Sequence, residues 1–281
     1  MTAGDNVLQA KALLAKTSTK APFDWRRTPG LGVATGSVFA FLYLPLIVLS
    51  IYSFNGGDQV TVWSHVSLRW FREIFRNDAI QLATWNSLIV ATAATIISTI
   101  CAICAAMALE RGARLAGRNL SISLIAMPLV VPEIVTAVAT LIFFTSIGLK
   151  LGIGNLIVAH TVFCIPFAML PIRARLREMG EAAETAARDL YASEWKVFWT
   201  VTLPLLMPAV LSGVMLAFVT SLDDFIISQM VADPGMTTLP MYIYGMIRLG
   251  VKPEVNAVST LLLLASMTLV GGAYLLSKYK K

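Results

Sequence analysis

The sequence predicts an all-α, polytopic membrane protein with six transmembrane helices, and three observations support this fold class. Hydrophobic residues make up 57% of the chain and charged residues only 14%, and the mean hydropathy of +0.74 is typical of an integral membrane protein. Several apolar stretches supply the roughly 20 residues that a helix needs to cross a hydrocarbon core. These stretches lack the alternation of a membrane β-barrel, and a helix satisfies its own backbone groups in lipid.

Six apolar segments, taken in chain order, justify the six predicted spans. The first follows a tail, residues 1–30, that is too long and polar for a cleaved signal peptide, so we interpret this span as an uncleaved anchor. The third segment contains a single acid, Glu133; the fourth contains His160; and the fifth is interrupted only by Asp223 and Asp224. The predicted spans cover residues 31–54, 79–109, 119–149, 151–172, 197–232 and 255–277.

The distribution of lysine and arginine predicts the orientation of the chain, because cytoplasmic loops hold the excess of basic residues. An even number of spans places both termini on one side, and that side holds 16 of the 22 basic residues. The sequence therefore predicts a cytoplasmic N-terminal tail (1–30), a transmembrane domain (31–278) with a cytoplasmic loop at about 173–203, and a cytoplasmic C-terminal tail (279–281). The pI of 9.3 reflects this topology, and we expect no nucleic-acid binding.

Motifs for enzymatic chemistry and for metal binding are absent from the sequence. It contains no phosphate-binding Gly-x-x-x-x-Gly-Lys-Ser/Thr, no Ser/His/Asp set and no His-Glu-x-x-His. His65 and His160 each stand alone, and Cys101 and Cys104 lie in an apolar span where small packing residues are expected. We therefore expect no enzyme, no metal and no cofactor in this chain. Any transport by such a chain would need energy from an ion gradient or from another polypeptide.

One motif in the predicted cytoplasmic loop carries a specific resemblance. Ala186 and Ala187 are followed by Tyr191 four residues later, and Leu203-Pro204 opens the next span. This spacing resembles the EAA loop of the permeases of ATP-binding-cassette (ABC) importers. In that family the loop is a helix–turn–helix that docks into a groove of a separate subunit, which binds ATP and Mg²⁺. The resemblance thus implies a docking loop, residues 173–203, and it assigns the coupling to Glu184, Thr185, Ala186, Ala187, Asp189, Leu190, Tyr191, Leu203 and Pro204.

The docking loop departs from the family pattern at two positions. Thr185 stands where the family has glutamate, although Glu184 is adjacent, and Tyr191 stands where the family has glycine. A glycine in such a turn usually supplies a positive φ, which costs another residue roughly 1–2 kcal/mol. Either the turn is reshaped or Tyr191 makes a contact that offsets the strain. The alternative to docking is an ordinary surface helix with a Glu184–Arg188 pair.

The resemblance extends to one branch of this family, over residues 40 to 275. The segments that show this resemblance are Ser53-Phe54-Asn55, Pro132-Glu133-Ile134, His160-Thr161-Val162-Phe163-Cys164, Ser221-Leu222-Asp223-Asp224-Phe225, Thr238-Leu239-Pro240 and Pro253-Glu254-Val255-Asn256-Ala257. Together they resemble the second of the two unlike permeases of spermidine/putrescine importers. This implies the type I permease fold and import of polyamines across a bacterial inner membrane. The implied partners are two ATP-binding subunits, a different permease, a periplasmic polyamine-binding protein and membrane lipid.

Three acids inside predicted spans support a cationic substrate independently of the resemblance. An acid within a span costs about 2.5–3.5 kcal/mol on insertion scales and usually faces a bundle interior or an aqueous cavity. Glu133, Asp223 and Asp224 have no lysine or arginine within the spans to neutralise them, so a cavity lined by them attracts amines. Pro128 and Pro132 remove backbone hydrogen bonds and can open the helix beside Glu133. Alternatively, one of the aspartates caps or solvates the outer end of the fifth span.

Three aromatic residues complete the predicted substrate passage. By the resemblance Trp63 joins Glu133, Asp223 and Asp224, while Tyr242 and Tyr244 follow the Leu239-Pro240 turn. An aromatic face can hold an ammonium group by cation–π attraction. The alternative places these aromatic rings in the interfacial belt of the membrane.

A second function class uses the same acids. An ion-coupled secondary carrier for organic cations could employ them as a relay. Such a carrier more often shows inverted repeats with paired broken helices, which the sequence does not display, and it has no need of a docking loop.

Overall fold

The computed structural model describes residues 30–60, 62–112, 117–150, 152–250 and 252–279, with all their side chains except those of residues 269 and 273–279. Residues 1–29 of the predicted N-terminal tail and residues 280–281 of the predicted C-terminal tail lie outside these ranges. The chain forms two compact units, Met1–Leu49 and Ser50–Lys281. The greater part of the first apolar helix, α2 (Leu31–Tyr52), belongs to the first unit, and every later helix belongs to the second.

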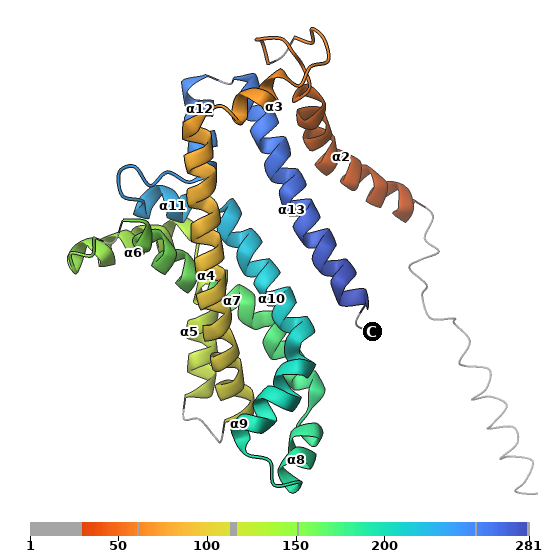
Figure 1. Ribbon diagram of the computed structural model, residues 1–281, viewed down its shortest axis with the longest axis vertical. Helices are drawn as coiled ribbons and strands as arrows, with labels where there is room; N and C mark the ends of the chain where they lie inside the picture. The colour runs from red at the N-terminus through yellow and green to blue at the C-terminus, as the bar shows by residue number, and fades with distance from the viewer. Residues whose placement is uncertain (1–29, 61, 113–116, 151, 251, 280–281) are drawn as a thin grey trace, which may run out of the picture. The chain divides into compact units, whose positions relative to one another are not determined.

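The described residues are helical throughout, apart from turns and one isolated bridge between Asn55 and Val66. Figure 1 shows α3 and α12 at one end of the long helix α4, and α8 and α9 at the other. After α2 the helices are α3 (Arg69–Ile74), α4 (Asp78–Arg111), α5 (Arg118–Val130), α6 (Glu133–Ser146), α7 (Ile153–Met179), α8 (Ala182–Asp189), α9 (Glu194–Val197), the π-helix η2 (Phe198–Thr202), α10 (Leu203–Asp223), α11 (Ile226–Val231), α12 (Leu239–Leu249) and α13 (Pro253–Tyr279).

The helices confirm the predicted all-α membrane fold. By length and composition, five stretches of the described residues can cross a membrane: Leu31–Tyr52, Asp78–Arg111, Ile153–Met179, Glu194–Asp223 and Pro253–Gly272. The pair α5 and α6 meets the same criterion when the two helices are taken together, which gives six spans if the pair is counted as one.

The third predicted span differs from a continuous helix over 119–149. It is divided into α5 and α6, which are bent by 109° relative to each other. Val131 is extended (φ −74°, ψ 136°) and Pro132 follows it, because a residue before proline avoids the helical region. Pro128, in contrast, lies inside α5 without ending it. The opening beside Glu133 therefore occurs at Pro132 alone, and Glu133 becomes the first residue of α6.

The fifth predicted span is also interrupted. A continuous stretch runs from Glu194 to Asp223, beginning three residues earlier than predicted, and the helix then stops at Asp224 (φ −66°, ψ 126°) before α11 begins. The predicted fifth span, 197–232, is therefore divided at Asp224, where the sequence has its two acids. The chain thus has interruptions in both its third and its fifth span, so the absence of paired breaks no longer argues against a carrier.

The core of the second unit is formed by close packing of α4, α7 and α10. The buried face of α4 is lined by small residues such as Ala91, Ala94 and Ala102. On α10, Gly213 lies so near α7 that a Cβ atom there would be 2.6 Å from the carbonyl oxygen of Ala168. Small residues of this kind let helix backbones approach closely in membranes. This packing holds α7 beside the interruption at the end of α10.

Candidate functional site

The two helix interruptions meet at a pair of carboxyl groups. Glu133 opens α6 and Asp224 precedes α11, and these two helices pack against each other. The packing of α6 against α11 therefore brings Glu133 and Asp224 into the same region of the fold. Neighbouring carboxylates repel each other when both are ionised, so a cation placed beside them is favoured. We call Glu133, Asp223 and Asp224 the acid cluster.

His160 of α7 joins the acid cluster from a third helix. Its Nδ1 atom lies 2.7 Å from the Ser221 hydroxyl oxygen and its Nε2 atom 3.0 Å from the Ser228 hydroxyl oxygen, both at hydrogen-bonding distance. Nε2 is also 3.3 Å from Oδ2 of Asp224. The His160 and Asp224 side chains are each only 1% exposed. One imidazole therefore connects the end of α10, through Ser221, with the beginning of α11.

Asp224 caps helix α11. Its Oδ1 accepts a hydrogen bond from the backbone NH of Ile227 (3.3 Å), and its Oδ2 accepts from the backbone NH (2.9 Å) and the hydroxyl (3.0 Å) of Ser228. A side chain in this position satisfies NH groups that the first turn of a helix leaves unpaired. Asp224 thus caps the start of α11, inside the predicted fifth span, and not the outer end of that span.

The other two acids are accessible. Asp223, the last residue of α10, is exposed, and Glu133 is partly exposed. Among the ion pairs formed by the described residues, none joins either acid to a lysine or arginine. The acid cluster therefore presents unneutralised carboxylates to a solute at Glu133 and Asp223, while Asp224 supports them from the buried side.

The predicted aromatic residues are divided between three places. Tyr244 of α12 packs on Phe225, directly after Asp224, with ring centroids 4.4 Å apart, and the Arg248 guanidinium lies 5.8 Å from the Tyr244 centroid. The Tyr242 hydroxyl accepts a hydrogen bond from the Asn77 side chain at 3.4 Å. Trp63 makes an edge-to-face contact with Tyr52 at 5.8 Å. Of the three, Tyr244 is the one that the described contacts bring beside the acid cluster.

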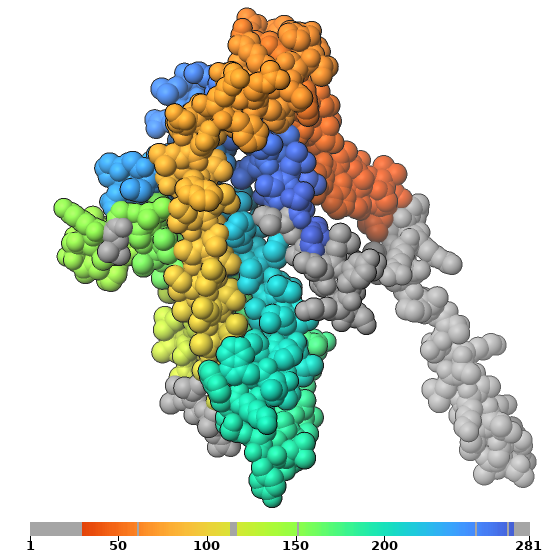
Figure 2. All heavy atoms as spheres, viewed as in Figure 1, coloured from red at the N-terminus to blue at the C-terminus, as the bar shows by residue number. Residues whose placement is uncertain are grey.

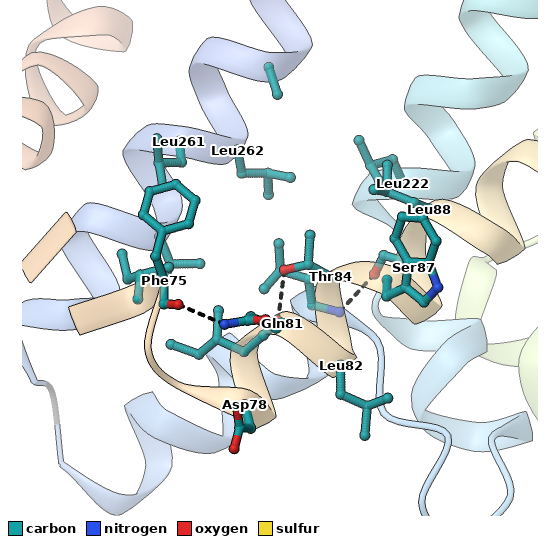
Figure 3. A pocket seen from close by; sticks show the side chains of 16 residues that line it. Phe75, Asp78, Gln81, Leu82, Thr84, Ser87, Leu88, Leu222, Leu261 and Leu262 are labelled. Carbon is teal, nitrogen blue, oxygen red and sulfur yellow. Dashed lines mark hydrogen bonds between the residues drawn. The ribbon is translucent and has the colours of Figure 1, made fainter. Parts of the chain in front are cut away.

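An apolar pocket of about 670 Å³ is lined mainly by residues of α4 and α13, with Leu222 of α10. Figure 3 shows Leu261 and Leu262 of α13 facing Leu88 of α4 and Leu222 of α10 across it. Gln81, at its polar side, donates to the carbonyl oxygen of Phe75 at 2.7 Å. Asp78 is the acid in its lining, none of the three acids of the cluster lines it, and most of its lining is apolar.

The docking loop forms two short helices joined by a strained turn. Tyr191 has φ +59°, and it is the one non-glycine residue with positive φ in the described ranges. Its backbone NH donates to the carbonyl oxygen of Arg188 at 2.8 Å, and that of Ala192 to the carbonyl oxygen of Ala187 at 3.2 Å. Tyr191 therefore adopts the positive φ that a glycine usually supplies in such a turn. Tyr191 is 99% exposed, so no residue in the described part of the chain packs on its ring to offset the strain.

The predicted coupling residues differ in accessibility. Those that are exposed are Thr185, Ala186, Asp189, Leu190, Tyr191 and Pro204; Ala187 and Leu203 are partly buried. Arg188 pairs with Glu194 at 2.7 and 3.1 Å, and not with Glu184 as the surface-helix alternative requires. Exposed Trp195 and Trp199, which sequence reasoning did not single out, extend the apolar surface next to Leu190 and Tyr191 in the chain. In Figure 2 the atoms of α8 and α9 lie at the end of the second unit.

Glu184 is the exception among the coupling residues, because it is buried. Its Oε2 accepts a hydrogen bond from Nε of Arg111 at 2.8 Å, and its Oε1 accepts from the Thr202 hydroxyl at 3.0 Å. The carboxylate thus faces the helices of this chain. Neither Arg111 nor His160 was predicted as a site residue, although each is a polar residue within or beside an apolar span.

Several known proteins are similar to this chain in sequence. A family model described as "Binding-protein-dependent transport system inner membrane component" matches residues 98–278. The putrescine transport system permease protein PotI of Escherichia coli (strain K12) is 40% identical over 251 residues, covering 86% of this chain and 89% of PotI. The spermidine/putrescine transport system permease protein PotC of the same strain is 34% identical over 244 residues, covering 87% of this chain and 92% of PotC.

The fold has a counterpart among solved structures. A chain from a bacterial ABC transporter involved in the import of the acidic polysaccharide alginate superposes with a TM-score of 0.69. The two chains are 15% identical, and the match covers 93% of this chain and 100% of that one. At 15% identity this similarity shows a shared fold and nothing about the substrate.

Proposed function

Because the chain belongs to the family of binding-protein-dependent transport system inner membrane components, we propose that it is a permease subunit through which an ATP-driven importer passes putrescine or spermidine. The observation that carries the substrate class is the acid cluster. Two interrupted helices place Glu133 and Asp224 in one region of the fold, Asp223 is exposed beside them, and no lysine or arginine of the described ion pairs neutralises Glu133 or Asp223. Polyamines carry the complementary charge, and charge-assisted hydrogen bonds to carboxylates are strong.

The aromatic residues contribute unequally in this proposal. Tyr244 lies on Phe225 next to the acid cluster, but Arg248 already lies over its ring. Trp63 and Tyr242 act at other points of the passage, or in the interfacial belt. The carboxylates therefore dominate recognition of the polyamine.

The energy comes from partner subunits in this proposal. Two ATP-binding subunits hold ATP and Mg²⁺ and dock on the exposed surface of the docking loop. A different permease completes the passage, and a periplasmic polyamine-binding protein delivers the substrate. Both termini and the docking loop lie in the cytoplasm, as the 16 basic residues on that side support. The ion-coupled carrier is not favoured, because the family and the relatives are those of binding-protein-dependent systems.

Two measurements on intact material test the proposal. In a strain that lacks this chain, restoring it is expected to restore uptake of labelled putrescine or spermidine, and an ATPase is expected to copurify with the tagged chain. Uptake that persists when the copurifying ATPase is deleted, and collapses when the proton gradient is dissipated, would support the carrier instead. Comparing the two labelled polyamines identifies the preferred one.

A further inference from the structure

The end of helix α4 is tied to the docking loop by a buried ion pair. Arg111 is the last residue of α4, and its Nε donates to Oε2 of Glu184 in α8 at 2.8 Å. Its Nη2 donates to the carbonyl oxygens of Leu176 (3.0 Å) and Gly180 (2.5 Å), where α7 ends. The Arg111 and Glu184 side chains are 11% and 3% exposed. One guanidinium thus holds α4, the end of α7 and α8 in a single geometry, as its planar fork of donors allows.

The same carboxylate reaches the beginning of the fifth span. Oε1 of Glu184 accepts a hydrogen bond from the hydroxyl of Thr202, the last residue of the π-helix η2, which is 1% exposed. η2 continues without a break into α10, and α10 ends at Asp223 in the acid cluster. A single helical stretch therefore connects the docking loop with the acids. A π-helical turn inside a helix often marks a functional position.

The residue before Arg111 anchors the other neighbours of α4. Glu110 accepts hydrogen bonds from Arg118 at the start of α5 (2.7 Å), from Arg177 of α7 (3.0 Å) and from Arg173 of α7. These pairs hold α4, α5 and α7 together at this end. These pairs therefore keep the ends of α4, α5 and α7 together when α8 is displaced. The displacement is transmitted through Glu184, because breaking its buried pair with Arg111 would leave an unpaired buried charge.

We propose that Arg111 and Glu184 are positioning residues that form an internal joint, which carries movement of the docking loop into α4 and, through Thr202, into α10. The proposal rests on the proposed function, since it concerns how ATP hydrolysis on a partner is linked to transport. It also gives Glu184 a role different from surface docking. In this proposal Glu184 contacts residues of its own chain, whereas its exposed neighbours contact the ATP-binding subunit.

The test uses the purified complex, with its ATPase and partner permease, reconstituted in vesicles, and measures ATP hydrolysed per labelled putrescine imported. Glu184→Gln removes the charge that pairs with Arg111, and Thr202→Val removes the hydroxyl but keeps the side-chain volume. Thr202→Ser keeps the hydroxyl, and Glu73→Gln, on the exposed face of α3, matches the change of charge elsewhere. The ATP-to-putrescine ratio is expected to rise at least about fivefold in Glu184→Gln and Thr202→Val, because removing one partner leaves a buried group unsatisfied. It is expected to remain near the parent value in Thr202→Ser and Glu73→Gln.

The outcomes separate this proposal from the proposed function. An unchanged ratio in assembled Glu184→Gln or Thr202→Val complexes would overturn the joint. Loss of the copurifying ATPase in Glu184→Gln, with normal coupling in Thr202→Val, would assign Glu184 to docking and would also overturn it. If Glu184→Gln does not assemble, the Thr202→Val and Thr202→Ser pair decides alone. Failure of the parent chain to copurify an ATPase or to import putrescine contradicts the proposed function before any variant is compared.

Discussion

The Nε2 atom of His160 lies 3.3 Å from Oδ2 of Asp224, and both side chains are buried. This contact joins α7 to the interruption between α10 and α11, where Asp224 also caps α11. The accessible acid Asp223 is the residue immediately before Asp224. The direction in which Asp223 projects therefore depends on a histidine that itself is not exposed to a solute.

Replacing His160 is expected to impair transport through this geometry. His160→Ala removes the partner of Asp224, Ser221 and Ser228 and leaves buried polar groups unsatisfied, at a cost of about 1–3 kcal/mol. Uptake of labelled putrescine is expected to fall about tenfold or more, the equivalent of ~1.4 kcal/mol, with most of the change in KM, while the chain still reaches the membrane. Uptake by His160→Asn, which keeps an amide that can form hydrogen bonds, is expected to lie between the uptake of the parent chain and that of His160→Ala. Normal uptake in assembled His160→Ala would show that the contact is dispensable.

Close packing between α7 and α10 gives a prediction about stability. A Cβ atom on Gly213 would lie 2.6 Å from the Ala168 carbonyl oxygen, so Gly213→Ala forces the helices apart at a cost of about 1–3 kcal/mol. The melting temperature of the detergent-solubilised chain is expected to fall. Gly245→Ala is the control, because a Cβ atom there meets nothing within 4 Å. Equal melting temperatures for the two variants would contradict the close approach.

The strained turn of the docking loop predicts opposite effects on stability and on docking. Tyr191→Gly relieves a positive φ that costs a non-glycine residue roughly 1–2 kcal/mol, so the chain should become slightly more stable. If the exposed ring anchors the ATPase, copurification of the ATPase and transport should both decrease. Tyr191→Asn separates the two effects, since asparagine tolerates this φ but lacks the ring. A fully active Tyr191→Gly variant would remove the anchoring role.

Ala187 supplies a direct test of the docking surface. It is partly buried in α8 beside exposed neighbours, and a helix laid in a groove leaves little room for a larger charged side chain. Ala187→Glu is expected to reach the membrane but to copurify markedly less ATPase than the parent chain. Undiminished copurification and transport would count against the docking assignment. Ala187→Ser, a small polar change, serves as the control.

Much of the fold can be predicted from sequence because apolar length is a local property. The apolar helices lie at the predicted segments, with breaks inside the third and the fifth, and the opening beside Glu133 follows from Pro132, because the residue before a proline avoids the helical region. No proline marks the break at Asp224 in the sequence. This break depends on the capping carboxylate of Asp224, which His160 of another helix contacts. Arg111 and Glu184 are 73 residues apart in the chain. Their pairing depends on tertiary packing, which no local pattern specifies, and this is why Glu184 could be assigned only to docking.

In the proposed function a polyamine passes the exposed carboxylates of the acid cluster, Glu133 and Asp223. The most direct test of this claim is uptake of labelled putrescine by vesicles containing the complete complex with Glu133→Gln, with Asp223→Asn or with both. Asp58→Asn, an exposed aspartate outside the cluster, is the matched control. Because charge-assisted hydrogen bonds contribute about 1.5–3 kcal/mol each, uptake is expected to fall about tenfold or more in each cluster variant and to stay near the parent value in the control. Normal putrescine uptake by assembled Glu133→Gln and Asp223→Asn complexes would contradict the claim.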